Sequence, residues 1–310
     1  MVTVYESFEN VHELSALHAA VDAGDWGGAA RVLEAMPTDD AVYALSLLAD
    51  REGAEVFLER AVDDDATQFA RVALALRYVA LGKLARSSAA DESQQYAVFR
   101  SWLSRAEVLL IDACARRPDL APAWSARVLT ARFLQVGRSE ADRRYEALRS
   151  LTSHNFPAQM DMLQYLLPKW FGTNDEAYTF VRRALAAAPP GAHTGALVPL
   201  FHIERWRELG GAWPGKQYML QQVVLDDLRN AAAMSVLHPS HRPGPIGVQA
   251  HSAFAMAYFV AGMEDEAARH LQIVAGRGTE YPWDYTCENS GEFAALRRRL
   301  MNRVAGGAAR

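Results

Sequence analysis

The chain has little cysteine. Cys114 and Cys287 are the two cysteines among its 310 residues, and they lie far apart without forming a Cys-x-x-Cys pair. This argues against a disulfide framework and favours a reducing compartment. The first residues also lack a basic start followed by an apolar run, so no secretory signal is predicted. We therefore expect a cytoplasmic protein.

Long apolar runs and an excess of positive charge are lacking as well. No uninterrupted apolar stretch approaches the ~20 residues that a membrane span needs. Lys and Arg number 32 against 37 Asp and Glu, which gives a net charge of −5 and argues against nucleic-acid or membrane partners. The cluster Arg297–Arg299 lies near the end of the predicted last helix, where cations suit the helix dipole.

Strict alternation of apolar and polar residues is also absent, so we predict no strands. What the sequence does contain is apolar residues at spacings of three and four, as at Phe69, Val72, Leu76 and Val79. Half of the chain is hydrophobic, which excludes a mainly disordered protein. Helices separated by short Gly, Asp or Pro punctuation account for the pattern, so the predicted fold class is all-α.

Three segments share a spacing in which a small residue follows a turn glycine by five positions and an apolar residue follows four positions later. They are Gly24–Ala29–Leu33, Gly172–Ala177–Val181 and Gly262–Ala267–Leu271. A glycine allows the turn, and a small residue allows two helices to cross closely. The offsets match the second helix of a tetratricopeptide repeat, whose period is ~34 residues.

These segments resemble the tetratricopeptide-repeat-like superfamily over most of residues 10–282, with weaker copies around Ala54, Ala106 and Ala141. Residues 154–172 and 251–283 also resemble uncharacterised actinobacterial helical-repeat proteins. The consensus aromatic of the first helix is often missing. The resemblance implies an α-solenoid of about seven helical hairpins with a C-terminal capping helix.

We expect one helical-repeat domain over residues 1–304, with its capping helix from Phe293 to Val304. Residues 83–95 are predicted to be a polar insertion that breaks the repeat period. Residues 238–247 are predicted to be a Pro- and Gly-rich loop. Residues 305–310 are predicted to be a disordered tail.

The resemblance implies a scaffold or adaptor that binds a peptide or helix of another protein in a concave, partly apolar groove. It implies no catalytic residue and no cofactor. Spacing in the predicted first helices suggests Phe133, Met256 and Phe259 as groove residues, and Trp170 is added as a conspicuous aromatic residue. The alternative for such apolar residues is packing between neighbouring hairpins.

A second hypothesis is a small-molecule-binding or catalytic helical-repeat protein. Its candidate site comprises Trp170, His238, His241 and Trp283. Together with His251, the two histidines are the densest histidine group, and three imidazoles could hold zinc. Because a Pro- and Gly-rich loop carries them and no His-Glu-x-x-His pair accompanies them, we predict no metal site. A third hypothesis is self-association, and the sequence predicts no oligomeric state.

Acidic clusters elsewhere have simpler interpretations. Asp226 and Asp227 resemble part of the magnesium motif of helical terpene cyclases, but no second motif follows them, so we interpret them as a solvated helix face. Asp63–Asp65 precede a predicted helix, whose N-terminus favours negative charge.

Overall fold

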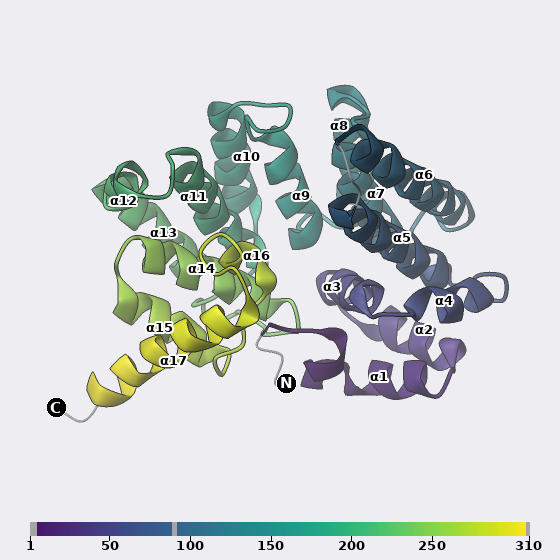
Figure 1. Ribbon diagram of the computed structural model, residues 1–310, viewed down its shortest axis with the longest axis horizontal. Helices are drawn as coiled ribbons and strands as arrows, with labels where there is room; N and C mark the ends of the chain where they lie inside the picture. The colour runs from purple at the N-terminus through teal and green to yellow at the C-terminus, as the bar shows by residue number, and fades with distance from the viewer. Residues whose placement is uncertain (1–4, 89–91, 308–310) are drawn as a thin grey trace. The chain divides into compact units, whose positions relative to one another are not determined.

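The computed structural model describes residues 5–88 and 92–307, and helices dominate these ranges (Figure 1). They contain 17 α-helices and no strand, and the model is 74% helical, which confirms the all-α prediction. The chain divides into two compact units. We call Ser7–Tyr165 the N-terminal unit, and Leu166–Arg310 together with Met1–Glu6 the C-terminal unit.

The N-terminal unit begins with two 3₁₀ turns, Phe8–Asn10 and His12–Leu14. Its α-helices are α1 (Ser15–Asp22), α2 (Trp26–Ala35), α3 (Thr38–Asp50), α4 (Ala54–Ala61), α5 (Phe69–Ser88), α6 (Glu92–Arg116), α7 (Ala121–Leu134), α8 (Arg138–Leu151) and α9 (Phe156–Leu166), which ends at the boundary.

Helices that follow one another in sequence pack against each other in this unit: α1 on α2, α4 on α5, α5 on α6, α6 on α7 and α7 on α8. The small residues predicted from the repeat spacing lie in these contacts. Ala29, Ala54, Ala106 and Ala141 are all buried. Alanine at such positions lets helix backbones approach closely, so the spacing identified the buried face of each of these helices.

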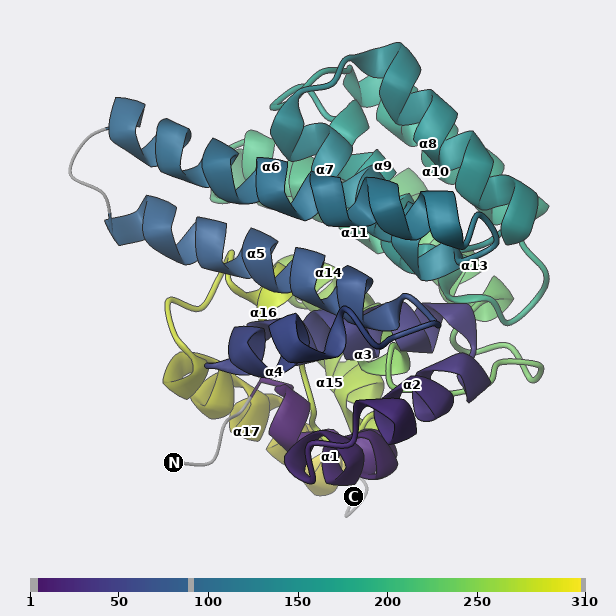
Figure 2. The ribbon, with the colours of Figure 1, turned by 90° about the vertical axis from the view of Figure 1, so that its right-hand side faces the viewer.

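The segment predicted as a polar insertion is helical where the structure describes it. Helix α5 continues to Ser88 and α6 begins at Glu92, while residues 89–91 of the predicted insertion lie outside the described ranges. Figure 2 shows the two helices side by side. Gly82 lies inside α5, and a Cβ at this position would lie 2.9 Å from a carbon of the Phe99 ring on α6.

The C-terminal unit contains the remaining helices. They are α10 (Asn174–Ala187), a 3₁₀ turn η3 (His193–Ala196), α11 (Leu197–Glu208), α12 (Trp213–Met219), α13 (Gln222–Met234), α14 (Gly247–Val260), α15 (Glu264–Ile273), α16 (Glu280–Trp283) and α17 (Ser290–Gly307).

Helix α14 is the centre of this unit, since α11, α12, α15, α16 and η3 all pack against it. Nearly all of its side chains are buried, including the polar His251 and Ser252, as expected of a helix with no solvated face. The Pro- and Gly-rich segment leads from α13 into α14 without helical structure. Helix α17 continues through Gly307, past the predicted end of the capping helix, and residues 308–310 of the predicted tail lie outside the described ranges.

Local capping explains where several helices begin. The Thr173 hydroxyl accepts a hydrogen bond from the Glu176 amide at 3.2 Å at the start of α10, as its sequence predicts. Asp65 accepts hydrogen bonds from the amides of Thr67 (2.9 Å) and Ala70 (2.6 Å) just before α5. No helix in the described ranges is long and apolar enough to cross a membrane.

Candidate partner-binding groove

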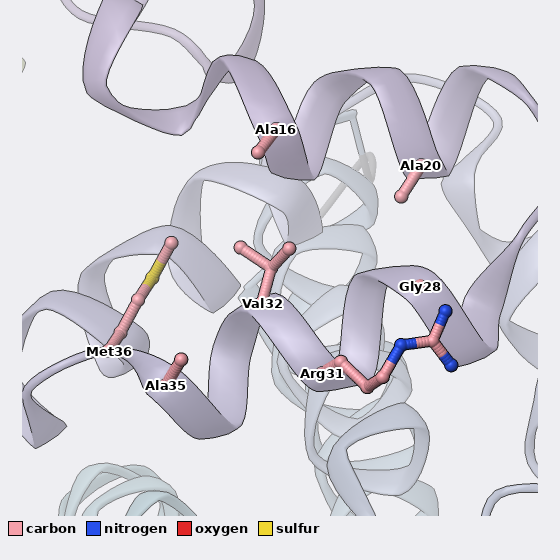
Figure 3. Close-up of a pocket in the computed structure, with 7 residues that line it drawn as sticks. All are labelled: Ala16, Ala20, Gly28, Arg31, Val32, Ala35 and Met36. Atoms are coloured by element: carbon pink, nitrogen blue, oxygen red, sulfur yellow. The ribbon is translucent and has the colours of Figure 1, made fainter.

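Helices α1 and α2 of the N-terminal unit leave an open groove between them, with a volume of about 600 Å³ (Figure 3). Ala16 and Ala20 face it from α1, and Val32 projects towards them from α2. The full lining consists of Ala16, Ala20, Gly28, Arg31, Val32, Ala35 and Met36. Small apolar residues thus dominate both walls, and Arg31 supplies the charge.

The groove exists because α2 has two different faces. Trp26, Ala29, Ala30 and Leu33 form its buried face. Val32 and Ala35 lie on another side and line the groove together with Ala16 and Ala20 of α1. Asp25 fixes the start of the helix, since its carboxylate accepts a hydrogen bond from the Gly28 amide at 2.8 Å.

A second hollow lies on the other flank of α2, between α2, α4 and the turn before α5. Its volume is about 640 Å³. Trp26 and Phe57 line it with their ring centroids 5.9 Å apart, while Arg60 and Asp64 provide charges. Arg31 also lines this α2–α4 hollow, so this one side chain borders both hollows.

The residues predicted to line a groove are not part of either hollow. Phe133 lies half-buried on α7, where its ring packs edge-on against Phe99 at 5.4 Å. The Arg132 guanidinium and the Lys83 ammonium lie 4.6 and 5.7 Å from its centroid. Trp170 belongs to the C-terminal unit and lies beside Phe171 in the turn after α9, with ring centroids 6.0 Å apart.

Met256 and Trp283 require a correction, because both are fully buried in the core of the C-terminal unit. Met256 points into packed neighbours since α14 is covered on all sides, so packing between helices is the right interpretation. Phe259 is half-buried, with its ring 5.9 Å from that of Trp283 and the Arg299 guanidinium 5.8 Å above it. These two aromatic residues stabilise the contact between α14 and α16.

The predicted histidine group is only partly assembled. The His241 ring lies 6.2 Å from His251, but its nearer neighbour is His193 at 5.1 Å. His251 in turn contacts His270 on α15, with their Nδ1 atoms 3.0 Å apart. His238 instead accepts a hydrogen bond from the Ser240 amide and takes no part in these ring contacts.

Burial is the main influence on this histidine row. Burial, with a smaller contribution from neighbouring imidazoles at His251 and His193, lowers the pKa of His251 to about 3 and the pKa values of His193 and His270 to about 4. These three rings are therefore neutral at ordinary pH. No group of three or more His, Cys, Asp or Glu side chains within residues 5–88 and 92–307 has the arrangement that a metal ion needs.

Sequence reasoning missed His193 and His270 as members of this row. His270 follows Ala267 by three positions on α15, so the same helical spacing that placed Ala267 in the core also places His270 there. His193 carried no comparable signal, because it sits in a short turn whose approach to His241 depends on the tertiary fold. The Nδ1 atom of His241 lies 2.9 Å from the Gly191 carbonyl oxygen, which holds the two segments together.

Two other polar networks are buried in the C-terminal unit. Glu204 accepts hydrogen bonds from Lys169 at 2.7 Å and from Tyr285 at 2.9 Å. Asp227, whose neighbour Asp226 is exposed, accepts from Arg182 at 2.8 Å and lies 3.5 Å from the His202 ring. Hydrogen bonds, with His202 the largest contributor, lower the pKa of Asp227, which keeps this carboxylate charged. Neither network lines one of the two hollows.

The fold and the groove define an all-helical protein whose N-terminal unit presents an apolar surface between two helices. No family model matches the chain, and no curated protein or solved structure matches it.

Proposed function

We propose that this protein is a scaffold or adaptor that binds a helical segment of a partner protein in the α1–α2 groove. The observation that carries the proposal is the groove itself, an open hollow of about 600 Å³ lined mainly by alanine, glycine and valine. Small side chains allow a third helix to approach the backbones of α1 and α2. An apolar helix face laid into such a groove is a common mode of peptide recognition.

The proposal includes the architecture. We propose that the consecutive helices are degenerate tetratricopeptide-like hairpins arranged as an α-solenoid. Support comes from the packing of sequence neighbours and from the buried alanines at the repeat positions.

A small-molecule or catalytic site is supported less well. Its proposed members include Trp283, which is fully buried, and His238, which stands apart from the histidine row. Glu204 is paired with Lys169, and Asp227 is paired with Arg182. The two hollows described above are both in the N-terminal unit.

The proposal can be tested with a phage-displayed library of random 16-residue peptides. Ala16 and Ala35 are exposed on their helices, so replacing both with glutamate fills the groove without disturbing the core. Selection on the wild-type protein should enrich peptides that bind A16E/A35E at least about tenfold more weakly, a loss of ~1.4 kcal/mol.

The matched control carries the same substitution at two exposed alanines elsewhere, Ala97 on α6 and Ala186 on α10. Peptide affinity for A97E/A186E should equal that of the wild type. A selection in which every enriched peptide binds A16E/A35E as well as the control variant contradicts the proposal.

A further inference from the structure

Arg31 occupies a particular place on α2, because it borders both hollows. On α2, Gly28, Val32 and Ala35 line the α1–α2 groove. Trp26, Gly27 and Ala30 of the same helix line the α2–α4 hollow. Resting on the proposed function of the groove, we infer that the partner segment is an amphipathic helix that crosses α2. This helix places an acidic side chain on Arg31 and an apolar side chain in each hollow.

The charge of the site selects an acidic partner. The Arg31 side chain is 75% exposed, and the closest atoms in its ion pair with Asp25 are 3.9 Å apart. The Asp25 carboxylate is already engaged at the start of α2, where it accepts from the Gly28 amide. The guanidinium can therefore take a carboxylate of the partner at hydrogen-bonding distance, which is a stronger contact than the long pair with Asp25.

The α2–α4 hollow also contains two acidic residues, Asp64 and Asp65. The Asp65 carboxylate accepts hydrogen bonds from the Thr67 and Ala70 amides at the start of α5. Arg60 lines the same hollow and carries the opposite charge. Arg31 lines both hollows, so it is the cation within reach of a partner carboxylate placed between them.

The apolar contacts differ between the two flanks. The α1–α2 groove is walled by alanine and valine and suits an aliphatic side chain. In the α2–α4 hollow the rings of Trp26 and Phe57 meet at an interplanar angle of 62°, which presents aromatic surface to an incoming side chain. The buried Trp26 Nε1 also lacks a hydrogen-bond partner among the described residues. An aromatic side chain suits this second hollow.

The width of α2 sets the spacing of the partner residues. A helix with its side chains is ~10–12 Å across. A helical partner rises ~1.5 Å per residue, so about seven residues separate the two apolar side chains. Positions i, i+3 or i+4, and i+7 lie on one face of a helix. The expected pattern is an apolar residue, an acidic residue three or four positions later and an apolar residue seven positions after the first.

The test uses peptides from the library selection that depend on the α1–α2 groove. They should share the apolar–acidic–apolar pattern, and Arg31→Glu should weaken their binding by at least about tenfold. Replacing the peptide's acidic residue with lysine should restore its binding to the Arg31→Glu protein. The same replacement should weaken its binding to the wild-type protein. The control Arg183→Glu changes an exposed arginine of α10 and should leave affinity unchanged.

The outcomes separate the two proposals. Peptides that lose affinity for A16E/A35E but bind Arg31→Glu normally, or that lack an acidic residue, overturn the acidic-helix inference and leave the groove as the binding site. Selection that yields no groove-dependent peptide overturns the proposed function itself. A peptide that depends on Arg31 but binds Phe57→Ala with wild-type affinity also contradicts the crossing of α2.

Discussion

The Nδ1 atoms of His251 and His270 lie 3.0 Å apart, in a part of the C-terminal unit where both rings are 2–3% exposed. One imidazole therefore donates a hydrogen bond through its Nδ1–H group, and the Nδ1 atom of the other accepts it. Phe254 stacks on His270 with ring centroids 5.1 Å apart, which closes the pair off on one side. Charging either ring would place an imidazolium in a desolvated environment beside the other imidazole, which costs free energy.

We predict that acid destabilises the protein through this pair and His193. Folding lowers the three pKa values from 6.5 to about 3 or 4, so below pH 6.5 the unfolded chain binds more protons than the folded one. The contribution of these histidines to the free energy of unfolding should fall as pH drops from 6.5 towards 4, by about 1.4 kcal/mol per pH unit for each histidine. Asp39, Asp161 and Asp284, whose pKa values burial raises to about 7, 6 and 6, contribute in the opposite direction. Urea unfolding followed by circular dichroism measures this slope.

One variant and one control show whether the histidines cause this slope of the unfolding free energy against pH. His251→Gln should reduce the pH dependence of the unfolding free energy by at least one histidine's share, while His12→Gln, at an exposed position, should leave it unchanged. An equal slope in wild type and His251→Gln would show that the acid sensitivity originates elsewhere.

We predict that Gly82→Ala destabilises the N-terminal unit by about 1–3 kcal/mol. A methyl group there would lie 2.9 Å from a Phe99 ring carbon and 3.0 Å from the Trp102 Cβ, so α5 and α6 would have to separate. Gly27→Ala, on an open part of α2, should instead stabilise the protein by about 0.4–1 kcal/mol. Denaturant midpoints of the two variants give the comparison, and equal effects would contradict the close packing of α5 on α6.

Gly82 also shows how far the sequence could go. The spacing of apolar and small residues predicted the helical class and the buried faces of α2, α4, α6, α8, α10 and α15, because helical periodicity is a local property. A glycine that permits a turn and a glycine that permits close helix contact look the same in one sequence. Only the position of Phe99 across the helix pair distinguishes them, and here Gly82 lies where α5 continues to Ser88.

The candidate site was harder to predict than the fold. Met256 and Phe259 were apolar residues on a helix with no polar face, and burial by five neighbouring elements is a tertiary property. The groove on α1 and α2 is lined mainly by alanine and glycine. These residue types do not by themselves indicate a binding site in a sequence. Their exposure depends on which helix faces remain uncovered after folding, and a spacing pattern does not record that.

We predict that Glu107→Ala destabilises the N-terminal unit by about 1–3 kcal/mol, since Glu140 still pairs with Arg127 and Arg144. Glu107 is 12% exposed and its Oε1 lies 3.1 Å from Arg127 and 2.9 Å from Arg144, so the substitution leaves two buried guanidinium groups without this carboxylate. Its Oε2 also accepts a hydrogen bond from Thr130 at 2.7 Å.

The matched control is Glu146→Ala, which removes an ion pair of 2.7 Å with Arg149 at the protein surface. Because water screens exposed pairs, its cost should stay below about 1 kcal/mol. Chemical denaturation of both variants decides the comparison, and a similar cost for the two glutamates would contradict a structural role for the buried cluster.

The most direct test of partner binding at α1 and α2 is hydrogen–deuterium exchange of the protein with and without a peptide from the library selection. Protection on binding is predicted in residues 15–35, which include both helices of the groove, with A16E/A35E showing no such change. Protection confined to the C-terminal unit, or equal protection in A16E/A35E, would contradict the assignment of the groove as the binding site.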